Sequence, residues 1–347
     1  MTMQSAASRS NSPQVSVLMP AYNCETYVAE AVSSMLSQTF ADFEFLVIDD
    51  GSTDATRAVL ESIHDPRLRV VSNPRNLGLI ATLNRGLELA GGRYIARMDA
   101  DDISAPERLE KQVRFLDAHP DVDVLGTMAN LINEEGRIFG SLADYPTSSG
   151  DVRQYLLREC CLVHPTVMFR KNAVQAVGGY DAAAQHAEDY DLWLRLSDRH
   201  LLANLPEKLV SYRMHRNQVS INNIATQHQV AQACRVAALK RRSAMGEDIS
   251  EAERVVKAGV WRKMTAAECT LGRDYLNWAR LYRTMRLPAM ALDLSTKAIL
   301  NSPLSHAAWA TLLMSLAEAT VPPSWQRAVK WYTYRLAKTL RPESHAS

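Results

Sequence analysis

The sequence lacks the cysteine patterns and the leader of a typical secreted protein. It has 5 cysteines among 347 residues, an odd number, and no two of them stand in a Cys-x-x-Cys spacing. Neither a disulfide framework nor a zinc knuckle is indicated, and a reducing, cytoplasmic setting fits this pattern. The first dozen residues are polar and small and contain no apolar core of a secretory signal.

Long apolar runs and an excess of one charge are also missing. The longest weakly charged stretch, residues 307–317, is far shorter than the roughly 20 apolar residues of a membrane span. Any membrane contact is therefore expected to be peripheral, at the inner face of the plasma membrane. The formal net charge of +1 argues against a nucleic-acid partner held by bulk positive charge.

The charges are unevenly distributed along the chain. Residues 1–220 hold 21 basic and 29 acidic side chains, whereas the remainder holds 18 and 9. We therefore expect two modules of opposite charge. The predicted organisation is a disordered N-terminus over 1–13, a catalytic domain over 14–220 and a helical C-terminal module over 221–347.

Strands and helices alternate regularly in the first hundred residues. Short apolar runs closed by polar clusters predict strands, and apolar spacings of three and four predict the helices between them. This rhythm predicts an α/β fold with a mainly parallel sheet, which binds ligands at the carboxyl ends of its strands. The expected strands are 15–19, 43–48, 68–71 and 94–98, and the expected helices are 25–37, 54–63 and 79–90.

The pattern changes after this region. We expect a helix over 106–118, a strand over 122–126, a hairpin over 128–142, a strand over 166–169, a helix over 189–198 and an extended segment over 208–212. Beyond residue 220 six helices are predicted, over 223–245, 249–270, 274–285, 288–300, 304–318 and 324–340.

Two features of the helical module leave alternatives open. Tyr282, Ala291, Ala298 and Pro303 fit a tetratricopeptide-like helix pair, although plain antiparallel packing is the favoured interpretation. Residues 324–341 form a basic amphipathic pattern, which is typical either of contact with an anionic membrane or of a packed terminal helix with a solvated face.

Three carboxylates follow the last of the regularly spaced strands, in Asp99-Ala100-Asp101-Asp102. Adjacent acids at the end of a buried strand repel one another unless a cation neutralises them. Oxygen ligands of this kind suit Mg²⁺ or Mn²⁺, which complete their coordination with substrate phosphates. A solvated turn that caps the next helix is the alternative.

A second polar group follows the first two strands. Pro20-Ala21-Tyr22-Asn23 ends the first strand, and Asp49-Asp50-Gly51-Ser52 ends the second. Adjacent strand ends of this kind form a pocket in which an aromatic ring can stack on a base and a carboxylate can accept a base N–H. Each segment alone is also ordinary turn chemistry.

Five motifs in this order closely resemble the family 2 glycosyltransferases of the GT-A fold. They are the two segments above, Asn76-Leu77-Gly78, the carboxylates at 99–102, and Glu188-Asp189-Tyr190-Asp191-Leu192-Trp193. The resemblance covers residues 14–220. It implies a GT-A fold that is followed here by an all-α module.

The resemblance also implies roles for single residues. Tyr22 would flank the nucleobase with backbone contacts from Pro20 and Ala21, and Asp50 would bind the base. Asp99 would hold the ribose or the donor sugar, Asp101 would bind the divalent cation, and Asp189 would be the catalytic base. Asn23 and Ala100 belong to the same donor-binding segments.

Further residues are weaker candidates. His215 matches a loop that closes over the nucleotide and supplies a metal ligand in some relatives. Arg213 or Arg216 would meet the diphosphate. His164 either faces the donor pocket or is a structural hydrogen-bonding group. Glu188 and Trp193 are candidates for the acceptor side, and the acids at 188–189 are alternatively ordinary first-turn residues of a helix.

The expected activity is metal-dependent transfer of a sugar, with inversion, from a nucleotide-diphosphate donor, most simply a UDP-sugar. The acceptor would be a saccharide or a lipid-linked saccharide in cell-surface polysaccharide synthesis. A nucleotidyltransferase that makes sugar nucleotides is the first alternative, although no Gly-x-Gly-x-Arg loop follows the first strand. A non-catalytic domain whose helical module recruits partners is the second.

Other common enzyme classes lack their signatures. No Gly-x-Gly-x-x-Gly segment follows a strand, no Gly-x-x-x-x-Gly-Lys-Ser/Thr loop occurs, and no Gly-x-Ser-x-Gly elbow is found. Dinucleotide-dependent, ATP-hydrolysing and serine-hydrolase activities are therefore not indicated.

Overall fold

The computed structural model describes residues 12–142, 144–215, 223–250, 270–285, 287–302 and 305–320, together with Gln218 and Glu253. The chain divides into two compact units. The first comprises residues up to His215 and residues 230–246, and the second comprises 216–229 and the chain from 247 onward. Helix α9 (Ile224–Ala244), which the sequence analysis assigned to the helical module, thus contributes residues 230–244 to the first unit.

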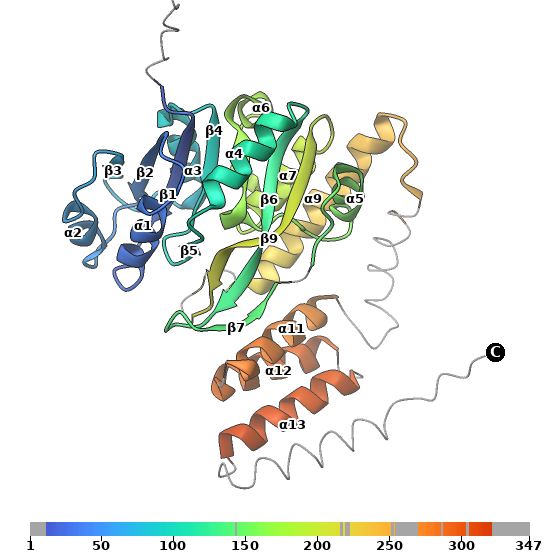
Figure 1. The fold of residues 1–347 in the computed structure, drawn as a ribbon. Helices are drawn as coiled ribbons and strands as arrows, with labels where there is room; N and C mark the ends of the chain where they lie inside the picture. The colour runs from blue at the N-terminus through green and yellow to red at the C-terminus, as the bar shows by residue number, and fades with distance from the viewer. Residues whose placement is uncertain are drawn as a thin grey trace, which may run out of the picture. The chain divides into compact units, whose positions relative to one another are not determined.

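One sheet of nine strands, counted over the described residues, organises the first unit (Figure 1). Its order is β3-β2-β1-β4-β8-β6-β9-β5, and β7, which is not in this order, pairs with residues 130–132 of β6. The strands are β1 (Val15–Ala21), β2 (Phe43–Asp49), β3 (Leu68–Ser72), β4 (Tyr94–Arg97), β5 (Ile103–Ser104), β6 (Val122–Ile132), β7 (Ile138–Ser141), β8 (Met168–Arg170) and β9 (Leu201–Arg213).

The sheet is mixed rather than uniformly parallel. Strands β3, β2, β1 and β4 are parallel, as the alternation of strands and helices predicts, and β9 runs parallel to β6. Strand β8 is antiparallel to both β4 and β6, β5 is antiparallel to β9, and β7 is antiparallel to β6. The antiparallel pairs involve strands that follow β4, where the regular alternation ends.

Helices cover both faces of the parallel half, which explains why β1 and β2 are buried along nearly their whole length. On one face, Val17 joins a core that includes Met35 of α1 and Leu109 of α4. On the other face, Leu18 lies against Gly86 of α3. The helices of this unit that precede α9 are α1 (Val28–Leu36), α2 (Thr56–Glu61), α3 (Leu79–Leu89), α4 (Arg108–Ala118), α5 (Ser149–Tyr155), α6 (Lys171–Ala176) and α7 (Glu188–Leu196).

Several short elements differ from the sequence-based expectation. His164–Thr166 forms a 3₁₀ turn with Pro165 at its start, so that β8 begins only at Met168 and not at residue 166. Strand β9 begins at Leu201, seven residues before the predicted start. Its first half contains Pro206 and an exposed Glu207, which interrupt the alternating pattern of an ordinary strand.

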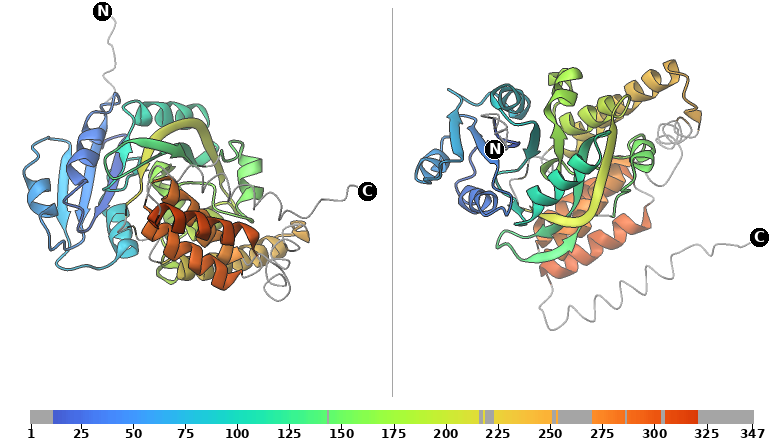
Figure 2. Two further views of the ribbon diagram at one scale, coloured as in Figure 1. Left: turned by 90° about the horizontal axis from the view of Figure 1, so that it is seen from below. Right: turned by 45° about the horizontal axis from the view of Figure 1, so that its top comes forward.

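The described part of the second unit contains three neighbouring helices, α11 (Thr270–Thr284), α12 (Pro288–Asn301) and α13 (His306–Thr320), which pack side by side (Figure 2). Tyr282, Ala291 and Ala298 are buried here, whereas Pro303 lies outside the described residues. The tetratricopeptide-like interpretation stays a prediction. Most of the helix expected over 249–270 and all of 324–341 also lie outside the described residues.

No helix among the described residues is both long enough and apolar enough to cross a membrane.

The contact between β1 and the loop before β4 gives a test of the fold. A Cβ atom at Gly92 would lie 2.7 Å from the Val15 carbonyl carbon, whereas at Gly91 its nearest neighbour is a Glu44 oxygen at 3.4 Å. Because backbone cannot yield as a side chain does, Gly92→Ala is expected to destabilise the fold by about 1–3 kcal/mol. Gly91→Ala, the matched control, should change it by less than about 0.5 kcal/mol. Urea unfolding measures both, and equal effects would contradict this packing.

Candidate active site

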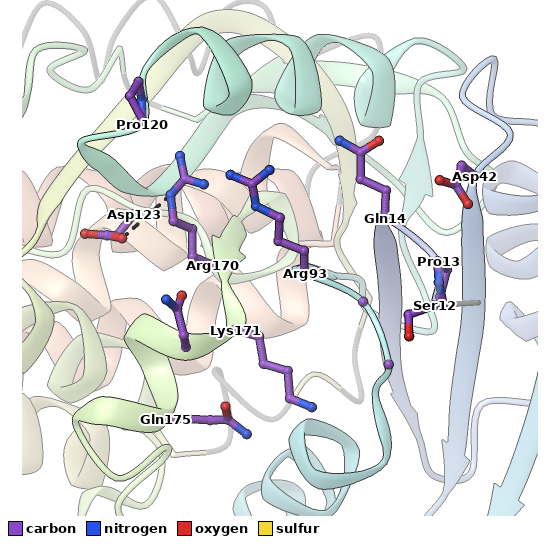
Figure 3. A pocket seen from close by; sticks show the side chains of 13 residues that line it. Ser12, Pro13, Gln14, Asp42, Arg93, Pro120, Asp123, Arg170, Lys171 and Gln175 are labelled. Atoms are coloured by element: carbon purple, nitrogen blue, oxygen red, sulfur yellow. Dashed lines mark ion pairs between the residues drawn. The ribbon is translucent and has the colours of Figure 1, made fainter. Parts of the chain in front are cut away.

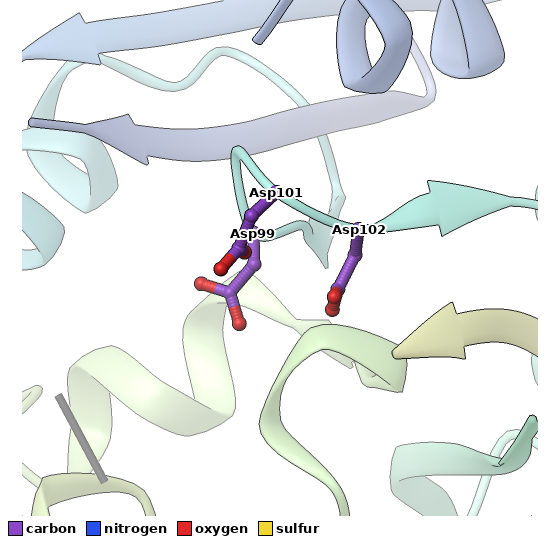
Figure 4. Close-up of side chains that lie close together, drawn as sticks. All are labelled: Asp99, Asp101 and Asp102. Carbon is purple, nitrogen blue, oxygen red and sulfur yellow. The ribbon is translucent and has the colours of Figure 1, made fainter. Parts of the chain in front are cut away.

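The three carboxylates predicted to bind a cation lie together at the carboxyl end of β4. Asp99, Asp101 and Asp102 each offer an oxygen atom, and these atoms lie within 4.8 Å of one another (Figure 4). The turn that carries them connects β4 to the short strand β5. Such a set of hard oxygen atoms fits the ligand preference of Mg²⁺ or Mn²⁺.

Each carboxylate of this cluster has a different environment. Asp99 forms an ion pair with Arg97, and Asp101 Oδ2 lies 2.8 Å from His215 Nε2. Asp102 accepts the Arg213 backbone N–H through Oδ1 at 2.8 Å. Its Oδ2 atom is buried and has no hydrogen-bond partner among the described residues. The structure thus brings Asp101 and His215 together, and it leaves one buried oxygen that a cation could satisfy.

Arg213 is directed into the protein, with 1% of its side chain exposed. Its Nε donates to the Asp101 carbonyl at 2.7 Å, Nη1 donates to the Glu134 carbonyl at 2.9 Å, and Nη2 pairs with Glu30. The guanidinium also lies over the Tyr27 ring, 4.6 Å from its centroid. These contacts fix the carboxylate turn, and the contact of Arg213 with a diphosphate stays a prediction.

Asp50 shapes the loop that follows β3. It is 4% exposed, and its oxygens accept the Asn73 side-chain N–H at 2.6 Å and the backbone N–H groups of Leu77 and Gly78 at 2.9 Å each. Several N–H donors around one carboxylate hold it in a fixed orientation. The contact of Asp50 with a base stays a prediction.

The segment after β1 is joined to the loop after β2. Asn23 adopts a positive φ of 47°, and its side-chain oxygen accepts the Thr53 N–H at 2.9 Å. Its own N–H donates to Ser52 Oγ at 3.0 Å. Tyr22 beside it is 45% exposed, so its ring is open to a ligand. Within the segments predicted to bind the donor, Ala21 and Ala100 are buried and Pro20 is partly exposed.

Asp189 and Glu188 lie at the start of α7. The pKa of Asp189 is raised to about 7, chiefly by burial and then by the neighbouring charge of Glu188, against the opposing effects of the Tyr190 backbone N–H and of Arg97. Burial also raises the pKa of Glu188. A carboxyl group that titrates near neutral pH has the proton affinity required of a general base or acid.

Trp193 is a buried residue of α7, and His164 lies in the interior close to it. His164 Nε2 lies 2.8 Å from the Tyr180 hydroxyl, and burial, together with the charge of Arg97, holds the pKa of His164 well below its ordinary value. The imidazole is therefore neutral at pH 7. Trp193 is fully buried, with its ring centroid 6.1 Å from that of His164, and offers no surface to an acceptor in this conformation.

Sequence reasoning missed Arg97, which lies among these groups. Its side chain is 3% exposed, and besides the ion pair with Asp99 its charge acts on Glu188, Asp189 and His164. A charged residue within the apolar strand 94–98 was the available signal. Such a residue requires a partner when it is buried.

One pocket of the structure lies away from this site. A cavity of about 830 Å³ opens where β1 and β4 begin, at the end opposite to the carboxylates (Figure 3). Basic side chains line it, but Arg170 lies 3.7 Å from Asp123 and Lys171 donates to the Ala90 carbonyl at 2.6 Å. It contains none of the predicted site residues.

Comparison with known proteins identifies the family. The sequence model described as Glycosyl transferase family 2 matches residues 16–178. An uncharacterized glycosyltransferase of Haemophilus influenzae is 39% identical over 220 residues, which cover 60% of this chain and 68% of the relative. The chain belongs to the family 2 glycosyltransferases. The O-antigen biosynthesis glycosyltransferase WbnJ of Escherichia coli is 34% identical over 61% of this chain and 84% of its own length.

Solved structures support the GT-A fold. Residues 1–349 of S. aureus TarS, in complex with UDP-GlcNAc, superpose with a TM-score of 0.56 and 20% identity, covering 94% of this chain and 90% of that one. The mannosyltransferase PcManGT of Pyrobaculum calidifontis, in complex with GDP-Man and Mn²⁺, gives a TM-score of 0.52 and 18% identity, with 94% and 86% covered. The expected α/β transferase fold is confirmed, and so is the glycosyltransferase class.

Proposed function

We propose that this glycosyltransferase transfers a sugar with inversion from a nucleotide-diphosphate donor, with UDP as the expected nucleotide. The acceptor is a hydroxyl group of a saccharide or of a lipid-linked saccharide in surface-polysaccharide synthesis. The observation that best supports the proposal is the cluster of Asp99, Asp101 and Asp102 at the end of β4 in a chain of this family. The O-antigen relative and the UDP-GlcNAc complex of TarS support the acceptor and the donor class.

The carboxylate cluster fits a divalent cation. Asp101 and His215 are the proposed ligands of Mn²⁺ or Mg²⁺, because their side chains meet at 2.8 Å and Asp102 leaves a buried oxygen beside them. When bound, such a cation offsets the charge that develops on the diphosphate leaving group. The Mn²⁺ complex of the mannosyltransferase supports this chemistry in the same fold.

Asp189 is the proposed general base. As the acceptor oxygen forms its bond to the anomeric carbon, the bond from that carbon to the diphosphate breaks and Asp189 takes the hydroxyl proton. One displacement of this kind inverts the anomeric centre. Tyr22 and Asp50 are the proposed contacts of the nucleobase, and Asp99 is that of the ribose or donor sugar.

Replacement of Asp189 tests the base. Asp189→Asn keeps the shape of the side chain but cannot accept a proton, so kcat should fall by about 10²–10⁴-fold. The Kd of the donor, measured by calorimetry, should stay near the wild-type value. Asp191→Asn is the matched control on the same helix, because Asp191 pairs with Arg195 at 2.7 Å. Undiminished turnover of the Asp189 variant would exclude it as the base.

The pH profile provides a second test. A base must be ionised, and a raised pKa of about 7 means that Asp189 becomes ionised only as the pH rises through neutrality. We therefore expect kcat/KM to fall below about pH 7, with an apparent pKa that belongs to the Glu188–Asp189 pair. A profile that is flat between pH 5 and about 8 would contradict this assignment.

Removal of the cation tests the carboxylate cluster. Chelation should abolish transfer, and Mn²⁺ or Mg²⁺ should restore it. Asp101→Asn should raise the Mn²⁺ concentration needed for half-maximal activity by about tenfold or more. Asp117→Asn, an exposed variant outside the cluster, is the control. Activity that survives exhaustive chelation would contradict the role proposed for Asp101.

A further inference from the structure

Arg97 is the last residue of β4, and its backbone is fixed on both sides. Its N–H donates to the Val167 carbonyl at 3.0 Å, and its own carbonyl accepts from Arg108 Nη2 at 2.7 Å. The side chain is therefore anchored at its base and extends beneath the carboxylate turn. There it meets Asp99, two residues further along the chain.

The guanidinium is enclosed by the protein. Its Nε and Nη1 atoms are buried: Nη1 faces the Asp99 carboxylate in the ion pair, and Nε has no hydrogen-bond partner among the described residues. Asp99 is less buried, with 28% of its side chain exposed. The pair therefore has a buried member and a member open to ligands.

We propose that Arg97 is a positioning residue for the donor, which acts by holding the Asp99 carboxylate in the orientation that binds the donor sugar or ribose. The proposal rests on the donor role proposed above for Asp99. A planar guanidinium fixes the direction of a carboxylate more strictly than a solvated cation does. Because Nε and Nη1 are shielded from solvent, these atoms are not placed to touch the donor themselves.

Because Arg97 is buried, loss of its ion pair with Asp99 is expected to have a large effect. A charged pair at the surface contributes little, whereas the loss of one partner of a buried pair leaves the other charge uncompensated. Tyr180 and the neutral His164 also lie close to Arg97, but their direct hydrogen bond is to each other. Asp99 is the group that pairs directly with the guanidinium, and through it a change at Arg97 reaches donor binding, whereas the charge of Arg97 acts separately on the proposed base Asp189.

A double-mutant cycle tests whether Arg97 affects donor binding through Asp99. The variants are Arg97→Met, Asp99→Asn and the combination of the two, and the measurements are kcat/KM for the donor and the Kd values of UDP-GlcNAc and UDP. If Arg97 acts on the donor through Asp99, each single variant should weaken the Kd of UDP-GlcNAc by about 10–100-fold, and the combination should weaken it little more than either one. Losses that multiply would overturn the proposal.

Two further variants separate positioning from loss of fold. Arg170→Met also removes a buried arginine, one that donates to the Val122 carbonyl at 2.9 Å away from the carboxylates. It should lower the thermal stability and leave the donor KM unchanged. Arg97→Lys keeps the charge without the planar fork and should restore part of the kcat/KM that Arg97→Met loses. No difference between the Lys and Met variants would contradict the pairing.

A crystal structure of the Arg97→Met variant separates this proposal from the proposed function. A reoriented Asp99 carboxylate supports the positioning role, and an unchanged one contradicts it, whatever the activity. Absence of transfer by the wild-type protein with every UDP-sugar of a panel would contradict the proposed function and leave this structural result standing.

Discussion

Three carboxylates within 4.8 Å of one another at the end of a buried strand impose the main constraint on this structure. Their mutual repulsion has to be offset, and their oxygens have to be held in place. Arg97 pairs with Asp99, and Arg213 of β9 donates its backbone N–H to the Asp102 carboxylate and its Nε–H to the backbone carbonyl of Asp101. The long course of β9 along β6 ends at Arg213, so that Arg213 and His215 lie at the carboxylates that follow β4.

The same constraint governs the proton chemistry proposed at Asp189. Burial raises the pKa of Asp189 toward neutrality, and Glu188 adds to the effect, while Arg97 opposes it. Without a buried cation nearby, a carboxyl group in this position would be harder to ionise. One arginine thus joins the proposed donor contact at Asp99 to the proposed base, so that the two parts of the site share their electrostatics.

The sequence predicts the parallel half of the fold well, because long strands and amphipathic helices carry clear periodic signals. The mixed half was harder, since β5 and β8 have two and three residues and are too short to show a period. In the site, the acidic motif at 99–102 can be recognised in the sequence by its three adjacent charges. The importance of Arg97 could not be predicted, because it depends on burial and on an ion-pair partner that only the folded chain shows. The aromatic Trp193 suggested an acceptor contact, but the apolar face of α7 places it in the core.

The candidate site contains side chains that are fixed by hydrogen bonds or ion pairs and side chains that are exposed, and we expect the two kinds to contribute differently to donor binding. Asp50, Asn23 and Asp99 are fixed by neighbouring N–H groups or by Arg97, and they lie where the common parts of a nucleotide sugar are expected to bind. TarS with UDP-GlcNAc and the mannosyltransferase with GDP-Man share this fold, although their donors differ in both base and sugar. The fold alone therefore does not specify a donor. We expect donor selection to depend on side chains around the strand ends, such as the exposed Tyr22, where a few substitutions can change the pocket without disturbing the sheet.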